Sequence, residues 1–201
     1  MKRLLTTLII CLFLLETGSA TQYYVSPTGN NANSGITPSL AFRSIDKGIL
    51  TASSYDTVVV LSGVYLTNAS LVINKPLALI GKDAVVDGST WSSSISNKRL
   101  LTISNTNDVL VDGFGFKNLI GDFSIGVFIT GSGRNITVQH CRVTNVGWIS
   151  NNLSAKPMSV NNANGILILG SDAKSLSQVN ILYDTISNCA LGFSEALTVV
   201  G

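Results

Sequence analysis

Three charged residues, Asp112, Lys117 and Arg142, occupy places where strand-like segments would turn their side chains towards solvent. Lys117 and Arg142 fall in adjacent repeats of a pattern described below, so their cations could together hold an anionic sugar. Asp112 is either part of the same substrate site or a solvated carboxylate at a turn. We therefore predict a substrate-binding surface formed by these three residues, without assigning a catalytic residue.

Two further carboxylates, Asp122 and Glu195, each lie near the start of an apolar strand-like segment. Carboxylate oxygens are the ligands that Ca²⁺ prefers, so these residues are the predicted metal ligands and Ca²⁺ is the predicted cofactor. His140 is the only histidine, and without a second ligand or a nucleophile it is interpreted as a structural or surface residue. Cys141 and Cys189 could pair as a disulfide or remain free thiols, and their places in the repeat leave both alternatives open.

The elements that position these residues are repeated segments of eleven residues. The segments share apolar residues at the second, fourth and ninth places and end in Asn, and they run from Asp108 to Asn118, from Asn135 to Asn145 and from Gln178 to Asn188. They start 27 and then 43 residues apart, a recurrence typical of a solenoid in which each repeat packs only on its neighbours. The final Asn of each segment should therefore stack on the others, giving an amide ladder of Asn118, Asn145 and Asn188.

A second family of short segments alternates with the first. It comprises residues 100–104, 127–131, 166–170 and 197–201. Their alternation points one set of apolar residues into the core, and it turns Thr102, Phe128, Leu167 and Thr198 towards solvent or a binding groove. The polar stretches 91–98 and 147–164 are predicted to be surface loops.

The order of these segments predicts an all-β protein, a parallel β-helix closed by a short N-terminal capping helix. Residues 21–55 should form a strand, a loop and that helix, which is expected within residues 41–50 because Phe42, Ile45 and Ile49 have helical spacing. Residues 56–201 should form the rungs, which we expect to continue beyond the chain end because no cap follows. The run A-V-V-D-G ending at Gly88 matches V-L-V-D-G, so Asp87 is predicted to occupy the place of Asp112 in an earlier rung.

Composition and the first residues bound the function. Only 12% of the 201 residues are charged and the net charge is +2 without a basic block, which argues against nucleic acid as a partner. Residues 1–20 have the pattern of a cleaved signal peptide, with Lys2 and Arg3 before an apolar run and small residues before Thr21. That run is too short to span a bilayer, so we predict a secreted protein that starts at Thr21 and has no membrane span.

The chain resembles the right-handed parallel β-helix proteins of the pectate lyase-like group, and in particular the N-terminal part of family 9 polysaccharide lyases. The resemblance is carried by Y-Y-V-S-P-T-G-N-N-A-N-S-G (residues 23–35), then F-R-S-I-D-K-G (42–48), then D-T-V-V-V-L-S-G-V-Y (56–65), and by short strands that end in Asn. It implies a secreted, monomeric protein that acts on an acidic polysaccharide, with Ca²⁺ and a basic side chain doing the chemistry in the lyases of the group. A non-catalytic carbohydrate-binding or cell-surface β-helix is the alternative.

Overall fold

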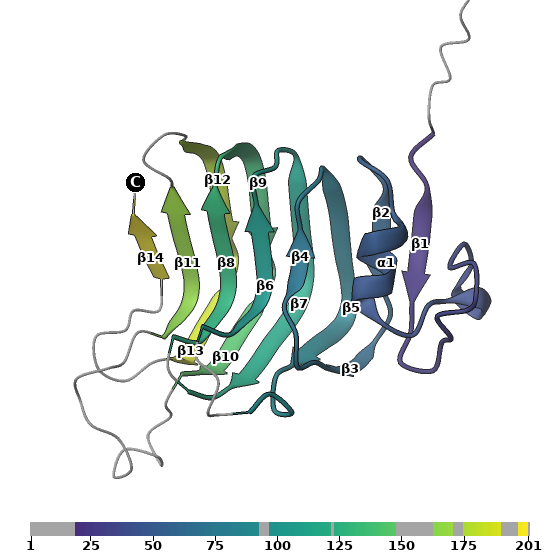
Figure 1. Ribbon diagram of the computed structural model, residues 1–201, viewed down its shortest axis with the longest axis horizontal. Helices are drawn as coiled ribbons and strands as arrows, with labels where there is room; N and C mark the ends of the chain where they lie inside the picture. The colour runs from purple at the N-terminus through teal and green to yellow at the C-terminus, as the bar shows by residue number, and fades with distance from the viewer. Residues whose placement is uncertain are drawn as a thin grey trace, which may run out of the picture.

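The computed structural model describes residues 19–92, 97–121, 123–147, 163–170, 175–189 and 197–200. Short strands stack side by side along one axis, from β1 at one end to β14 at the other (Figure 1). The elements in chain order are β1 (Gln22–Val25), the 3₁₀ helix η1 (Pro38–Leu40), α1 (Ile45–Thr51), β2 (Thr57–Val60), β3 (Gly63–Leu66), β4 (Leu71–Ile73), β5 (Leu77–Asp87), β6 (Arg99–Ser104), β7 (Val109–Leu119), β8 (Ile125–Gly131), β9 (Gly133–Gln139), β10 (Arg142–Val146), β11 (Asn164–Gly170), β12 (Leu176–Leu182), β13 (Thr185–Cys189) and β14 (Leu197–Val200).

Every strand pair is parallel, and the strands form three walls around one core. The first-limb sheet contains β1, β2, the first halves of β5 and β7, β9 and β12. The second-limb sheet contains β3, the second halves of β5 and β7, β10 and β13. The third sheet has the order β14-β11-β8-β6-β4. One strand from each sheet makes a rung, which is the parallel β-helix expected from the repeats.

The strand register confirms the alignment of the repeated segments residue by residue. Val109 pairs with Ile136, and Ile136 pairs with Val179 in the next rung. The ninth places pair in the same way, Phe116 with Val143 and Val143 with Ile186. The step of 43 residues is therefore a single rung, like the step of 27, and most of the extra residues lie between β10 and β11, with the others between β11 and β12.

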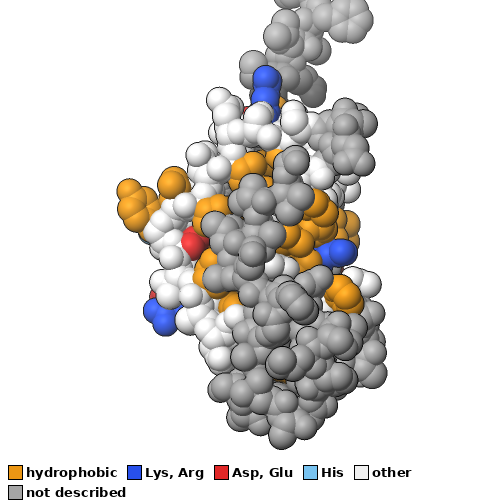
Figure 2. All heavy atoms as spheres, turned by 90° about the vertical axis from the view of Figure 1, so that its left-hand side faces the viewer, with side chains coloured by type: hydrophobic (Ala, Val, Ile, Leu, Met, Phe, Trp, Pro, Cys, Tyr) orange, Lys and Arg blue, Asp and Glu red, His pale blue; other side chains and the backbone are white. Residues whose placement is uncertain are grey.

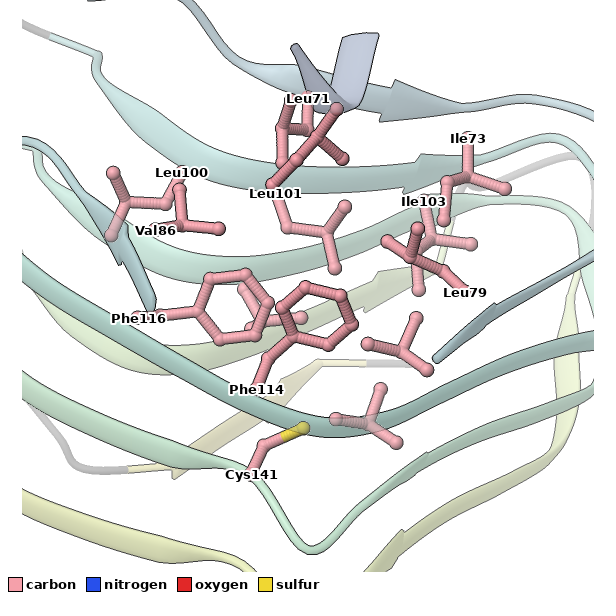
Figure 3. Packing of buried hydrophobic residues seen from close by; sticks show 14 of the residues in the cluster. Leu71, Ile73, Leu79, Val86, Leu100, Leu101, Ile103, Phe114, Phe116 and Cys141 are labelled. Carbon is pink, nitrogen blue, oxygen red and sulfur yellow. The ribbon is translucent and has the colours of Figure 1, made fainter. Parts of the chain in front are cut away.

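The core consists of apolar side chains from all three walls, packed between the sheets (Figure 3). Alternation along each strand sends every second side chain inward, which explains why Leu101, Ile103, Val109 and Val111 are all buried. Full burial of each such side chain contributes roughly 1.5–3 kcal/mol. The rings of Phe114 and Phe116 stack with centroids 5.7 Å apart, so the centre of the helix is filled by aromatic as well as aliphatic groups.

The N-terminal cap covers the first rung with one strand and one helix. β1 extends the first-limb sheet by pairing with β2, and α1 buries Ile45 and Ile49 against the core. The helix begins at Ile45, later than predicted. Phe42 lies before it in an isolated bridge to Val25, and its ring stacks on Tyr23 at 6.0 Å. Phe42 is therefore buried from an extended segment and does not belong to the apolar face of the helix.

At the other end of the stack, hydrophobic side chains are visible among the described residues (Figure 2). Val179, Ile181 and Ile186 point inward from the last first-limb and second-limb strands, yet they are only partly buried. In the preceding rung Ile136, Val138 and Val143 occupy the same places and are fully buried. A rung thus needs a neighbour on both sides to bury its inward residues.

The predicted equivalence of Asp87 and Asp112 is wrong. Asp87 pairs with Lys117 on the second limb, whereas Asp112 pairs with Ile80 on the first. The two runs share letters but lie on opposite sides of the bend, because paired residues of β5 and β7 are 32 or 30 positions apart, whereas Asp87 and Asp112 are 25 positions apart. The earlier rung itself is present, as expected.

Two expectations of surface exposure are also wrong. Phe128 points outward from the third sheet in register with Thr102 and Leu167, but it is buried, and the guanidinium of Arg99 lies 4.5 Å from its ring centroid. In the stretch 91–98, Lys98 is fully buried and its Nζ donates to the carbonyl oxygens of Ser92 and Ile120. Long side chains can bury their apolar stems in this way, which residue type alone does not reveal.

An amide column runs along the corner where the second limb ends. Nδ2 of Asn188 donates to Oδ1 of Asn145 at 2.5 Å, and Nδ2 of Asn145 donates to Oδ1 of Asn118 at 3.1 Å. Asn118 in turn donates to Oδ2 of Asp87 at 3.0 Å, so the column contains one more member than the sequence indicated. All three asparagines have φ between 49° and 61°, the left-handed region that Asn tolerates better than other non-glycine residues.

We expect Asn145→Leu to destabilise the fold by about 2–4 kcal/mol, because it removes two hydrogen bonds of the column and forces a branched side chain into the left-handed region. Asn145→Gly keeps the backbone conformation and should lose only the hydrogen bonds. Asn68→Leu, at an exposed turn, is the control. Urea unfolding of the three variants measures the differences, and equal stability of Asn145→Leu and Asn68→Leu would contradict the column's role.

Candidate functional site

The predicted binding residues lie on two different faces. Asp112 ends the first-limb half of β7, while Lys117 lies in its second-limb half and Arg142 begins β10. Gly113, with φ 77°, makes the bend between them, so Asp112 is not on the same sheet face as the two cations. The predicted metal ligands Asp122 and Glu195 lie outside the described residues.

On the second-limb face, Lys117 is already compensated by a carboxylate. Its Nζ lies 3.5 Å from Oδ2 of Asp87, which is buried. Burial opposes ionisation of Asp87, but hydrogen bonds from Ser89 and Asn118 and the charge of Lys117 together hold its pKa below the usual value. Arg142 is exposed and forms no ion pair within the described ranges. Only Arg142 of the predicted cation pair is therefore available to an anionic ligand.

On the first-limb face, Asp112 is held by two side chains of the next rung. Nε2 of Gln139 donates to Oδ2 at 3.0 Å, and Nδ1 of His140 lies 2.9 Å from Oδ1. Partial burial opposes ionisation, but these hydrogen bonds and the charges of His140 and Lys82 lower the pKa of Asp112 overall. Because a carboxylate can only accept hydrogen bonds, the Nδ1–H of His140 must be the donor, which leaves Nε2 free of this pair.

His140 and Tyr183 occupy the same place at the bend in successive rungs. Their rings are nearly parallel, 7° apart, with centroids separated by 5.2 Å. Both residues have positive φ, 50° and 57°, like Gly113 at the same place one rung earlier. Tyr183 is 81% exposed, so one of its faces meets the imidazole and the rest of the ring meets solvent.

A groove of about 430 Å³ crosses the outward face of the first limb and ends at this cluster. Its floor is apolar, with Ala78 on β5 and Leu110 on β7, and it is bordered by groups that can donate or accept hydrogen bonds. At one side, Nδ2 of Asn135 donates to Oδ1 of Asp108 at 2.7 Å, with Tyr55 beside them. At the other side Gln139 lines the groove and donates to Asp112, so the groove and the His140–Tyr183 cluster are continuous.

The two cysteines are free thiols. Cys141 is buried, and burial raises the pKa of its thiol to about 12, so it is not available as a nucleophile at neutral pH. Its backbone N–H donates to Oδ1 of Asp184 at 2.7 Å, and burial raises the pKa of Asp184. This pair belongs to the packing beneath the bend and not to the groove.

In the described part of the chain, no three His, Cys, Asp or Glu side chains come together in a way that could hold a metal ion. The carboxylates nearest the groove, Asp108 and Asp112, are each engaged by neighbouring amides, and they lie at opposite ends of the first-limb half of β7. A Ca²⁺ site that includes Asp122 or Glu195 remains a prediction.

Reasoning from the sequence missed the link between Asp112, Gln139 and His140. It treated His140 as a lone residue, although His140 lies 28 positions after Asp112, one repeat of 27 plus one residue. Once the repeat is known, polar residues separated by 27 or 28 positions are candidates for side-chain pairs across adjacent rungs. Tyr183 lies 43 positions after His140, which is the second repeat spacing, so the same rule would also have paired these two residues.

No family model and no curated protein matches this chain. Among solved structures, it is similar to a rhamnogalacturonan lyase, with a TM-score of 0.55 and 13% identity over 74% of this chain and 41% of that one. It is also similar to the family PL6 alginate lyase AlyGC, with a TM-score of 0.50 and 15% identity over 83% of this chain and 20% of that one. Pectate lyase Pel9A gives a TM-score of 0.50 and 15% identity over 75% and 47%.

All three similar structures are polysaccharide lyases, and the likeness confirms the predicted right-handed, pectate lyase-like β-helix. The chain spans less than half the length of each of them. Among its described residues, no helix has the length and apolar character needed to cross a bilayer.

The hydrogen bonds to Asp112 should be visible in its titration. We expect the pKa of Asp112 to lie below the ordinary value of an Asp carboxyl group, and to rise in Gln139→Ala and His140→Ala because each variant removes a donor to the carboxylate. Carbon-detected NMR across pH 2–6 (a window set about that ordinary Asp value) measures the midpoint. Arg142→Ala is the control, because within the described ranges Arg142 forms neither a hydrogen bond nor an ion pair with Asp112. An unchanged midpoint in both test variants would rule out the network.

Proposed function

We propose that this protein binds a polysaccharide along the outward face of the first limb. The observation that supports this most directly is the groove of about 430 Å³ that crosses β5, β7 and β9. Neighbouring strands are spaced by ~4.8 Å, so outward side chains follow one another at a regular interval across the face. A polymer made of repeating units matches such a surface better than a compact ligand does, because successive units can meet successive rungs.

The chemistry of the groove suits a ligand with apolar patches and many hydroxyl groups. Leu110 and Ala78 offer apolar contact, while Thr137, Asn135 and Gln139 can donate and accept hydrogen bonds. Their partners within the protein lie in adjacent rungs, so the side chains are held in place before a ligand arrives. Such preorganisation reduces the entropy lost on binding.

We further propose that the bound polysaccharide is acidic. Lys82 is close enough to Asp112 to lower the pKa of that carboxyl, so one cation lies near the end of the groove. It could attract carboxylate groups of a uronic acid polymer, in line with the substrates named for two of the similar structures, an alginate lyase and a pectate lyase. The signal peptide pattern of residues 1–20 supports a secreted location, where such polymers occur.

The groove can be tested by filling it. Thr137→Arg places a long side chain in the groove, and we expect at least a tenfold loss of affinity for the bound polymer, about 1.4 kcal/mol. Thr144→Arg is the matched control, since Thr144 is also a half-buried outward residue but lies on the second limb. Affinity electrophoresis and calorimetry with polygalacturonate, rhamnogalacturonan and neutral galactan measure binding. Equal binding by both variants would exclude the first-limb groove.

A polysaccharide lyase is the second candidate, favoured by the three lyase structures with this fold. Elimination at a uronic acid requires a base beside the C–H group and a positive charge at the carboxylate. The described residues do not bring such groups together in the groove: His140 lies at its end and Lys117 is paired with Asp87 on another face. If the protein is a lyase, its catalytic groups lie outside the described residues.

We therefore expect this chain of 201 residues to bind polysaccharide without cleaving it. Incubation with polygalacturonate, with and without Ca²⁺, should give no rise in ultraviolet absorbance from unsaturated product, while binding persists. An absorbance increase that is lost in Asp112→Ala would instead establish the lyase and would place its chemistry on the first limb.

A further inference from the structure

Tyr55 is the aromatic residue among those that line the groove of the first limb. It lies two residues before β2, which has β1 on one side and β5 on the other, so described strands flank its rung in both directions. Its φ of 69° is in the left-handed region, which is unfavourable for a bulky side chain. The side chain is 63% exposed, so burial compensates little of that cost. Such strain is concentrated at functional sites, where the surroundings enforce it.

The backbone conformation at this place belongs to the repeat, but the aromatic ring does not. In later rungs the same place holds Asp108 and Asn135, with φ of 54° and 56°. Asp and Asn tolerate the left-handed region better than other residues with a side chain do. The turn into the first limb therefore requires a left-handed residue, and the ring of Tyr55 needs a separate explanation.

The strand register shows how the side chain of Tyr55 lies. Pro76 follows Tyr55 and Asp108 follows Pro76, each one rung further along the stack. The hydroxyl of Tyr55 nevertheless donates to Oδ2 of Asp108, in a long hydrogen bond of 3.5 Å. Two steps between neighbouring strands amount to ~10 Å, so the side chain must extend along the axis of the stack. This is the direction in which the groove crosses β5, β7 and β9, and the ring therefore lies lengthwise at its side.

Asp108 is itself fixed at the same side of the groove. Its Oδ1 accepts a hydrogen bond from Nδ2 of Asn135 at 2.7 Å, so both carboxylate oxygens are engaged by side chains that line the groove. The ring of Tyr55 is thus held from later rungs before a ligand arrives, which reduces the entropy lost on binding. A ligand group that meets the ring also meets the charge of Asp108 beside the phenolic hydroxyl.

We infer that Tyr55 is a stacking surface for one neutral pyranose unit of the polymer, and that Asp108 is its positioning residue. The inference rests on the proposed function. A pyranose ring has a face made of C–H groups, which the negative face of an aromatic ring attracts. The unit is neutral because the carboxylate of a uronate would lie close to the carboxylate of Asp108, and like charges repel. Acidic units of the same polymer belong at the other side of the groove, near Lys82.

The stacking surface is tested with rhamnogalacturonan, in which neutral and acidic units alternate. Tyr55→Asn removes the ring but suits the left-handed backbone, and we expect it to bind about 3- to 10-fold more weakly, as for the loss of one aromatic contact. Tyr55→Phe keeps the ring and should recover most of the binding. Leu66→Ala is the matched control, because Leu66 is 62% exposed, much like Tyr55, but lies on β3 of the second limb. Calorimetry measures the affinities, and wild-type affinity in Tyr55→Asn would overturn the stacking surface.

The role of Asp108 is tested with two variants that separate its charge from its hydrogen bonds. Asp108→Ala should weaken binding of rhamnogalacturonan, because the Tyr55 hydroxyl loses its acceptor. Asp108→Asn keeps an acceptor and should restore that binding. It also removes the negative charge, so binding of polygalacturonate, which consists of uronate units, should become tighter than in wild type. A merely structural role of Asp108 would not change the preference between the two polymers, and an unchanged preference would overturn the neutral unit.

These outcomes are distinguishable from failure of the proposed function. If Thr137→Arg abolishes binding while Tyr55→Asn binds like wild type, the groove is correct and the stacking surface is wrong. If wild-type protein binds polygalacturonate but not rhamnogalacturonan, the groove is correct and the neutral unit is wrong. If wild-type protein binds neither of these polymers nor galactan, the groove and the stacking surface fail together.

Discussion

The fold depends on the stacking of like side chains across adjacent rungs. The hydrogen bonds between polar side chains show this dependence most directly. A half-buried amide needs both a donor and an acceptor, and in a solenoid both must come from the neighbouring rungs. The column from Asn188 through Asn145 and Asn118 ends at Asp87. Two single hydrogen bonds, from Asn135 to Asp108 and from Gln139 to Asp112, likewise end at a carboxylate in the earlier rung. Because a carboxylate only accepts, it sets the direction in which every amide donates.

The repeats allowed the fold and register to be predicted because inward places tolerate few residue types. Val109, Ile136 and Val179 align by sequence and pair in the structure, since a change of register by one residue would expose the whole apolar set. The same approach failed for two residues with similar local sequences but different places in their rungs. Asp87 and Asp112 follow almost identical residues, but Asp87 lies seven positions after Ile80, the partner of Asp112, and is on another wall.

The candidate site was harder to predict than the fold, because outward places do not share a residue type. Asp112 was identified as an outward carboxylate, but its partners Gln139 and His140 come from a different repeat and have no common motif with it. Of the two predicted cations, Lys117 forms an ion pair with Asp87 in the neighbouring rung and is therefore less available to a ligand. Outward side chains are constrained by their neighbours across the sheet, and a neighbour becomes known only once the register is known.

The corner between the second limb and the third sheet has a consequence for how such a protein can change. Ile186 follows its partner Val143 by 43 residues and Val143 follows Phe116 by 27, yet both pairs keep the same register. The second-limb strand of this rung ends with β10, and the third-sheet strand begins with β11, where Asn164 pairs with Ile125. Because the closure entropy of a loop grows only with the logarithm of its length, each doubling costs about 0.6 kcal/mol. Insertions at this corner should therefore cost little folding free energy and leave the sheets and the core unchanged. Evolution or design could use them to add specificity.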